Sequence, residues 1–85
     1  MNETAVRLAT RGVRVLHVQV NASGRHVYLL HSTTDGWDAA MFLSDADDLM
    51  NERATLDQII RRNQGEDLAD PWPAPSDLLA EMAVA

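Results

Sequence analysis

Alternating apolar and polar positions predict two neighbouring strands early in the chain. Residues 13–20 and 25–32 are rich in β-branched, aromatic and large apolar side chains, and residues 21–24 between them end in glycine. A four-residue loop would place Val20 opposite Arg25 in an antiparallel hairpin. After turn residues at 33–36, residues 37–43 read as a third strand.

This register sorts the apolar side chains onto two sheet faces. The first face carries the pairs Leu16/Leu29 and Val18/Val27, with Ala40 and Phe42 beside them, and is expected to be core. The second face collects Val13, Val15, His17, His26, Tyr28, Leu30, Trp37, Ala39, Met41 and Leu43. Its pairs in the first two strands are Val15/Leu30, His17/Tyr28 and Gln19/His26. A face with so many apolar side chains is not expected to be exposed to water. We expect it to be covered by the N-terminal helix together with the C-terminal tail, by a second copy of the chain, or by a partner.

Charged residues support the same register. At the edge of the first face, Asp38 would lie beside His31 and Arg14, which places opposite charges in one row across the sheet.

Helical periodicity flanks the predicted sheet. Residues 3–11 form a short predicted helix, with Asn2 as its N-cap and Gly12 as its C-cap. A second helical pattern covers residues 45–64 and follows Ser44, an expected N-cap. We predict one helix of about five turns there.

An alternative to the single helix stays open. Thr55 and Gln58 have the spacing of a capping box, which would divide this region into two short helices.

After Gly65 the chain becomes acidic and proline-rich. Trp72 stands among prolines 71, 73 and 75, which favour an extended backbone, and Ser76 or Asp77 could cap a last short helix. The expected fold class is therefore α+β: a three-stranded antiparallel β-meander packed by one main α-helix, with a short N-terminal helix and a Pro-rich C-terminal tail. We expect residues 1–65 to form a single domain and residues 66–85 to form the tail.

The charge is unevenly distributed along these elements. The 85 residues carry a net charge of -6 and no cysteine, which excludes disulfides and thiolate chemistry. Residues 1–32 contain four arginines against one glutamate, whereas residues 33–85 contain three arginines against twelve acids. An acidic C-terminal half argues against nucleic-acid binding along the whole chain.

The absence of a signal-like start or an apolar run of about 20 residues predicts a cytoplasmic protein that does not bind membranes.

Catalytic and metal-binding patterns are missing from the sequence. No serine lies in Gly-x-Ser-x-Gly, and the histidines form no ligand motif. The acids at 45, 47 and 48 do not follow the ligand spacing of a calcium-binding loop. Their place in the first turn of the predicted helix, where carboxylates cap the helix, is enough to explain them. We predict no catalytic residue, no cofactor and no metal.

Apolar surfaces and acidity together favour a non-enzymatic protein-binding module. We expect an inhibitor or neutraliser of a basic nucleic-acid-handling partner, of the antitoxin or phage anti-defence (anti-CRISPR) kind, an analogy that rests on charge and size. The second sheet face could also support a homodimer. The predicted partner-binding residues are Tyr28, Trp37, Met41, Asp45, Asp47, Asp48, Glu52, Asp67, Asp70 and Trp72. The alternative is a small nucleic-acid-binding regulator that uses Arg14, His17, Arg25 and His26 of the N-terminal hairpin.

Overall fold

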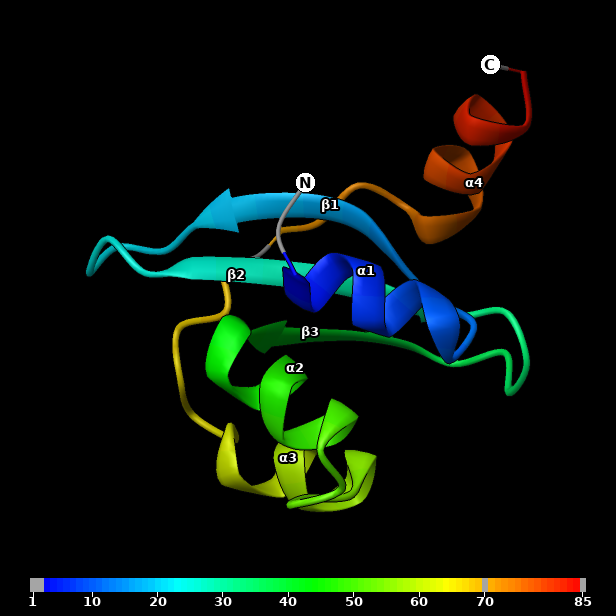
Figure 1. Cartoon of the computed structure of the whole chain (residues 1–85). Coiled ribbons are helices and arrows are strands. Elements are labelled where there is room, and N and C mark those ends of the chain that lie inside the picture. Colours follow the sequence, from blue (N-terminus) through cyan, green and yellow to red (C-terminus); the bar gives the residue numbers. More distant parts are fainter. Residues whose placement is uncertain (1–2, 70, 85) are drawn as a thin grey trace.

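A three-stranded antiparallel sheet with strand order β1-β2-β3 lies at the centre of the molecule (Figure 1). The computed structural model describes residues 3–69 and 71–84. The elements are α1 (Glu3–Thr10), β1 (Val13–Val20), β2 (His26–Ser32), β3 (Asp38–Phe42), α2 (Leu43–Met50), α3 (Leu56–Arg62) and α4 (Pro75–Val84). The predicted α+β meander and its short N-terminal helix are confirmed. The predicted N-cap of that helix, Asn2, lies outside the described residues.

The pairing of β2 with β3 follows the predicted register. Leu29 pairs with Ala40, Val27 with Phe42, and His31 with Asp38. The Nδ1 atom of His31 lies 2.7 Å from Oδ1 of Asp38, and Arg14 pairs with His31, so the expected row of Arg14, His31 and Asp38 is present.

The pairing of β1 with β2 is as predicted only in the first part of β1. Val15 pairs with Leu30, but a β-bulge follows, and His17 then pairs with Leu29. Leu16 is the extra residue. The predicted pairs Leu16/Leu29, His17/Tyr28, Val18/Val27 and Gln19/His26 are therefore wrong, and each is displaced by one position.

The loop between β1 and β2 accounts for the same one-residue shift where the two strands meet it. It has five residues rather than four, and Val20 pairs with His26 instead of Arg25. The side-chain Oδ1 of Asn21 accepts hydrogen bonds from the backbone N–H of Ser23 and of Arg25, at 3.1 and 2.8 Å. This Asx-type geometry closes the loop at Arg25 and delays the start of β2 by one residue.

Three helices of the same chain cover the second sheet face. Leu8 of α1 and Met50 of α2 pack with Leu30 and Met41 of the sheet in one buried cluster, and Ile59 of α3 completes it. Figure 1 shows α1, α2 and α3 on one side of the sheet. The homodimer predicted through this face would therefore have to displace helices. Large apolar side chains remain exposed at Val18, Val20 and Leu43.

The first face is buried as predicted except at Val18, which the bulge turns to the other face and leaves 42% exposed. The tail crosses this first face after α3, and not the second face that we expected it to cover. Val27, Leu29 and Phe42 are at most 5% exposed, yet they do not belong to the cluster beneath the helices. Figure 1 shows residues 66–69 and 71–74 behind the sheet, the latter leading to α4 beside β1.

The prediction of one long helix over residues 45–64 is wrong. α2 ends at Met50, Glu52 adopts a left-handed backbone with φ 59°, and α3 starts after Thr55. Thr55 Oγ1 accepts from the Gln58 N–H at 3.2 Å, and Gln58 Oε1 accepts from the Thr55 N–H at 2.9 Å. This reciprocal capping box is the alternative that the sequence offered.

Two helix starts also differ from the predictions. α2 begins at Leu43 with Phe42 in the N-cap position, so Ser44 is not the cap. The carboxylate of Asp45 accepts a hydrogen bond from the Phe42 N–H at 3.1 Å and does the capping from inside the helix. The predicted last helix is present as α4, but it begins at Pro75, which suits the first helical turn because proline lacks an N–H.

Candidate partner-binding surface

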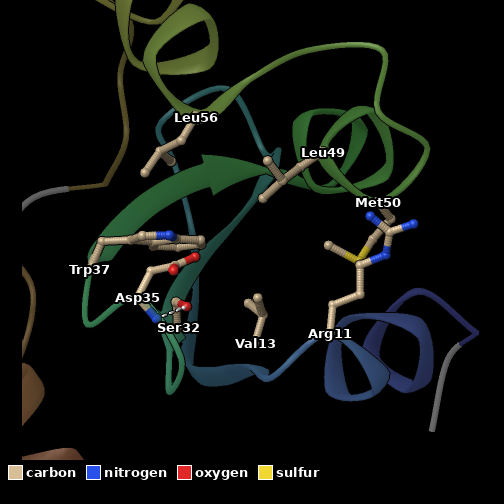
Figure 2. A pocket seen from close by; sticks show the side chains of 8 residues that line it. All are labelled: Arg11, Val13, Ser32, Asp35, Trp37, Leu49, Met50 and Leu56. Carbon is tan, nitrogen blue, oxygen red and sulfur yellow. Dashed lines mark hydrogen bonds between the residues drawn. The ribbon is translucent and has the colours of Figure 1, made fainter.

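A groove opens between the sheet and the helices on the side of the molecule where α1 ends (Figure 2). Its volume is about 280 Å³. The end of α1, the start of β1, the β2–β3 turn and α2 with α3 all contribute to it. The lining residues are Arg11, Val13, Ser32, Asp35, Trp37, Leu49, Met50 and Leu56. Most of this wall is apolar, and its aromatic member, Trp37, is half-buried.

The β2–β3 turn positions one wall of the groove. The Ser32 N–H donates to the Trp37 carbonyl at 2.9 Å, and Ser32 Oγ accepts from the Asp35 N–H at 3.0 Å. Ser32 is 1% exposed, so these bonds are shielded from water. Figure 2 shows Asp35 and Trp37 side by side on this wall. Within the part of the chain that the structure describes, the Asp35 carboxylate has no ion pair.

Arg11 lies at the opposite end of the groove, near Met50 (Figure 2). Its Nη1 atom is 3.6 Å from Oε1 of Glu52. The groove therefore carries one arginine whose charge is balanced by a neighbour and one carboxylate, Asp35, whose charge is not.

A buried carboxylate joins α2 to α3. Asp45 is 4% exposed, and Oδ1 accepts from Arg62 Nε and Nη2 at 3.0 and 2.5 Å. Oδ2 accepts from Asn63 Nδ2 at 2.7 Å and from the Phe42 N–H. With both oxygens engaged, Asp45 holds the two helices against the end of β3.

The other acids of α2 are engaged at the surface. Asp47 lies 3.6 Å from Arg7 and 3.2 Å from Arg53, and Asp48 lies 2.8 Å from Arg62. The hydrogen bond from Arg62 is the main cause that lowers the pKa of the Asp48 carboxyl below its ordinary value. The same contacts raise the pKa of Arg62.

Asp67 attaches the tail to the β1–β2 loop. Its Oδ2 accepts from the Ala22 N–H at 2.9 Å, its Oδ1 accepts from the Ala69 N–H at 3.0 Å, and its carbonyl accepts from Asn21 Nδ2 at 3.0 Å. The backbone donors, Ala22 first and Ala69 second, lower the pKa of the Asp67 carboxyl.

Trp72 packs the tail against β1. Its ring meets His17 edge-on, with the centroids 5.8 Å apart and the planes at 86°. Close by, Gln19 Nε2 donates to the Pro71 carbonyl at 3.5 Å. The indole Nε1 of Trp72 is buried without a hydrogen-bond partner in the described structure.

The predicted partner-binding residues are thus divided among different environments. Met41 is fully buried and Asp45 nearly so, which removes both from any surface that a partner could contact in this conformation. Tyr28 is half-buried against the core, and Trp37 lines the groove. Glu52 is exposed at the end of the groove that holds Arg11, and Asp70 lies outside the described residues.

The residues of the nucleic-acid alternative do not form one site. The bulge places His17 on the face of Leu29, whereas His26 pairs with Val20 on the opposite face. Arg14 is exposed beside His31, and the guanidinium of Arg25 stacks 3.7 Å from the centroid of the Phe42 ring.

Sequence reasoning missed much of the groove, including Arg11, Asp35, Leu49 and Leu56. The available signal was the Asp35-Gly36-Trp37 segment, a turn motif that directly precedes an aromatic strand residue. Leu49 and Leu56 could not be assigned to one wall while residues 45–64 were predicted as a single helix.

Over residues 3–69 and 71–84, no group of three or more histidine or acidic side chains could hold a metal ion. In the same ranges, no helix has the length and apolar character needed to cross a bilayer.

No family model, curated protein or solved structure matches the chain.

Proposed function

We propose that this protein is a small acidic, non-enzymatic module that binds another protein through the groove beside Trp37. The observation that carries this proposal is the groove itself, in which a half-buried tryptophan lies beside an unpaired carboxylate. Aromatic side chains in partly enclosed, apolar surroundings are typical anchors of protein interfaces.

Exposed acids outside the groove favour a basic partner. Several carboxylates outside the groove form no ion pair with an arginine in the described chain: Glu3, Asp57, Glu66, Asp77 and Glu81. The exposed arginines without a carboxylate partner are fewer: Arg14, Arg25 and Arg61. This surplus of negative charge would speed encounter with a cationic surface and oppose contact with phosphate groups.

A nucleic-acid-handling protein is the partner class that best matches this charge. Such proteins carry cationic grooves for the phosphate backbone, and an acidic module of this size can occupy one and exclude the nucleic acid. The protein would then act as an inhibitor or neutraliser, in the manner of antitoxins and phage anti-defence proteins. The analogy is one of size and charge.

The proposal is tested by identifying a partner and measuring inhibition. The tagged protein would be used to recover partners from its native host, and each candidate would be purified and titrated in a fluorescence-anisotropy assay with labelled DNA or RNA. We expect a basic partner whose nucleic-acid binding falls as the protein is added, and whose affinity for the protein weakens with salt. Recovery of only neutral partners, or a partner whose nucleic-acid binding is unchanged, would contradict the proposal.

A direct gel-shift experiment separates this function from the alternative. At low salt, the wild-type chain and the Arg14→Ala/Arg25→Ala double variant would be mixed with DNA and with RNA. The protein-binding proposal expects no shift for either chain. A shift that disappears in the double variant would instead support a nucleic-acid-binding regulator.

A further inference from the structure

The groove beside Trp37 has the chemistry of a site for one cationic side chain. It combines an aromatic ring, a carboxylate without an ion pair and apolar walls from β1, α2 and α3 (Figure 2). These are the three elements that bind a guanidinium: the ring stacks on its plane, the carboxylate accepts its N–H groups, and the apolar wall packs along its methylene stem.

The charge within the groove favours a cation over an anion. Arg11, its positive group, is already held 3.6 Å from Glu52 at the far end. Asp35 is exposed, and the backbone N–H beside its carboxylate is already donated to Ser32 Oγ. Within the described residues, no hydrogen bond or ion pair engages the carboxylate, which can therefore accept hydrogen bonds from a ligand.

The size of the groove favours a single side chain. The groove has a volume of about 280 Å³, at the lower end of the range of about 300–1,000 Å³ that small-ligand pockets occupy. It is also partly open to solvent, which suits a residue that projects from a folded partner.

We infer that the groove takes an arginine side chain of the partner, stacked on Trp37 with its guanidinium at Asp35. This inference rests on the proposed function and specifies its contact. Arginine is preferred to lysine because a planar fork can stack on the indole and reach both carboxylate oxygens at once, whereas an ammonium is a point charge with a tighter hydration shell.

A small-probe titration tests the inference without the partner. N-acetyl-arginine N-methylamide would be added to the ¹⁵N-labelled full chain, and the indole N–H signals of the two tryptophans would be followed by NMR. The citrulline analogue has the same shape without the charge, and the lysine analogue has the charge without the fork. We expect the Trp37 signal to move with arginine, less with lysine and least with citrulline, while the Trp72 signal stays in place.

Matched variants assign the effect to the groove. Asp35→Asn should weaken arginine binding about tenfold, the loss expected for one charge-assisted hydrogen-bond pair. Glu81→Gln removes the same charge from an exposed position on α4, outside the groove, and should leave the affinity unchanged. Circular dichroism checks that both variants fold.

Three results would overturn the inference: no movement of the Trp37 signal, equal binding of citrulline, or equal weakening by both variants. Each can be distinguished from failure of the proposed function. If a basic partner is inhibited equally well by the wild type and by Asp35→Asn, the protein is an inhibitor and the arginine site is wrong. If the arginine probe binds but no basic partner is recovered, the site stands and the inhibitor function fails.

Discussion

Arg62 donates two hydrogen bonds to Oδ1 of Asp45, at 3.0 and 2.5 Å, and so joins the end of α3 to the start of α2. The two residues differ in exposure, with side chains 41% and 6% accessible, respectively. Because Asp45 is the buried member, its loss should be costly: the Phe42 N–H and the Asn63 amide would lose their acceptor in the interior.

The first prediction follows from this pair. We expect Asp45→Ala to lower the free energy of unfolding by about 3 kcal/mol, since removing one partner of a buried, hydrogen-bonded charge leaves the other groups unpaired. Urea denaturation followed by circular dichroism measures the change. Asp48→Ala is the matched control because it removes the more accessible carboxylate that binds the same arginine, and it should cost much less. Equal losses in the two variants would contradict the assignment of Asp45 as the central residue.

The second prediction concerns Gly12, which has φ +73° between α1 and β1. A Cβ there would meet Thr34 Cγ2 at 3.0 Å and Thr33 Oγ1 at 3.1 Å, whereas a Cβ at Gly24, with φ +84°, would meet nothing within 4 Å. Gly24→Ala should therefore cost only the backbone term, about 1 kcal/mol, and Gly12→Ala should cost more. Thermal unfolding of both variants provides the comparison. A smaller loss at Gly12 than at Gly24 would show that the two threonines yield easily.

The third prediction is a pH dependence in acid. The pKa values of Asp48 and Asp67 are lowered in the folded state, so the unfolded chain binds more protons as the pH falls. Their stabilising contribution is complete above the ordinary carboxyl pKa of about 4 and is lost as the pH drops through the lower folded values. Asp67→Asn should make the decline in stability shallower between pH 5 and about pH 2. Asp77→Asn removes a carboxylate that has no hydrogen bond in the described structure and serves as the control. An unchanged acid profile for Asp67→Asn would refute this role.

The fourth prediction concerns the buried indole nitrogen of Trp72. Trp72→Phe keeps a ring against His17 and removes an unpaired donor, so the free energy of unfolding should stay within about 1 kcal/mol of the wild type. Trp72→Ala should lower it by about 2 kcal/mol because the aromatic packing is lost. Chemical denaturation distinguishes these outcomes. If phenylalanine is as costly as alanine, the indole N–H must have a partner, such as a water molecule.

Much of the fold was predictable because it depends on local patterns. Period-two alternation located the three strands, and the Thr55/Gln58 spacing identified the correct helix boundary as an alternative. The bulge at Leu16 was not predictable from alternation, because it turns Val18 and Val20 outward and places His17 on the face of Leu29, the reverse of what the apolar pattern favours. The hydrogen bonds of Asn21 that lengthen the following loop depend on side-chain geometry rather than on hydrophobicity.

The site was less predictable than the fold. Trp37 was identified because it is an aromatic residue on the apolar second face of the predicted sheet, yet its neighbours in the groove come from elements far apart in the sequence. The acids of α2 were predicted to face a partner, but Asp45 is buried and Asp47 and Asp48 bind arginines of the same chain. Composition gives the net charge correctly and does not show which charges are already paired.

The attachment of the tail has a consequence for the order of folding. Asn21 and Asp67 are separated by 46 positions, and Gln19 and Pro71 by 52, whereas the hairpins of the sheet form between neighbouring segments. Contacts between distant segments are slower to form, so the tail should dock after the sheet and its three helices. Every residue that lines the groove lies between positions 11 and 56. A folding chain should therefore present a complete groove before its tail has docked on β1.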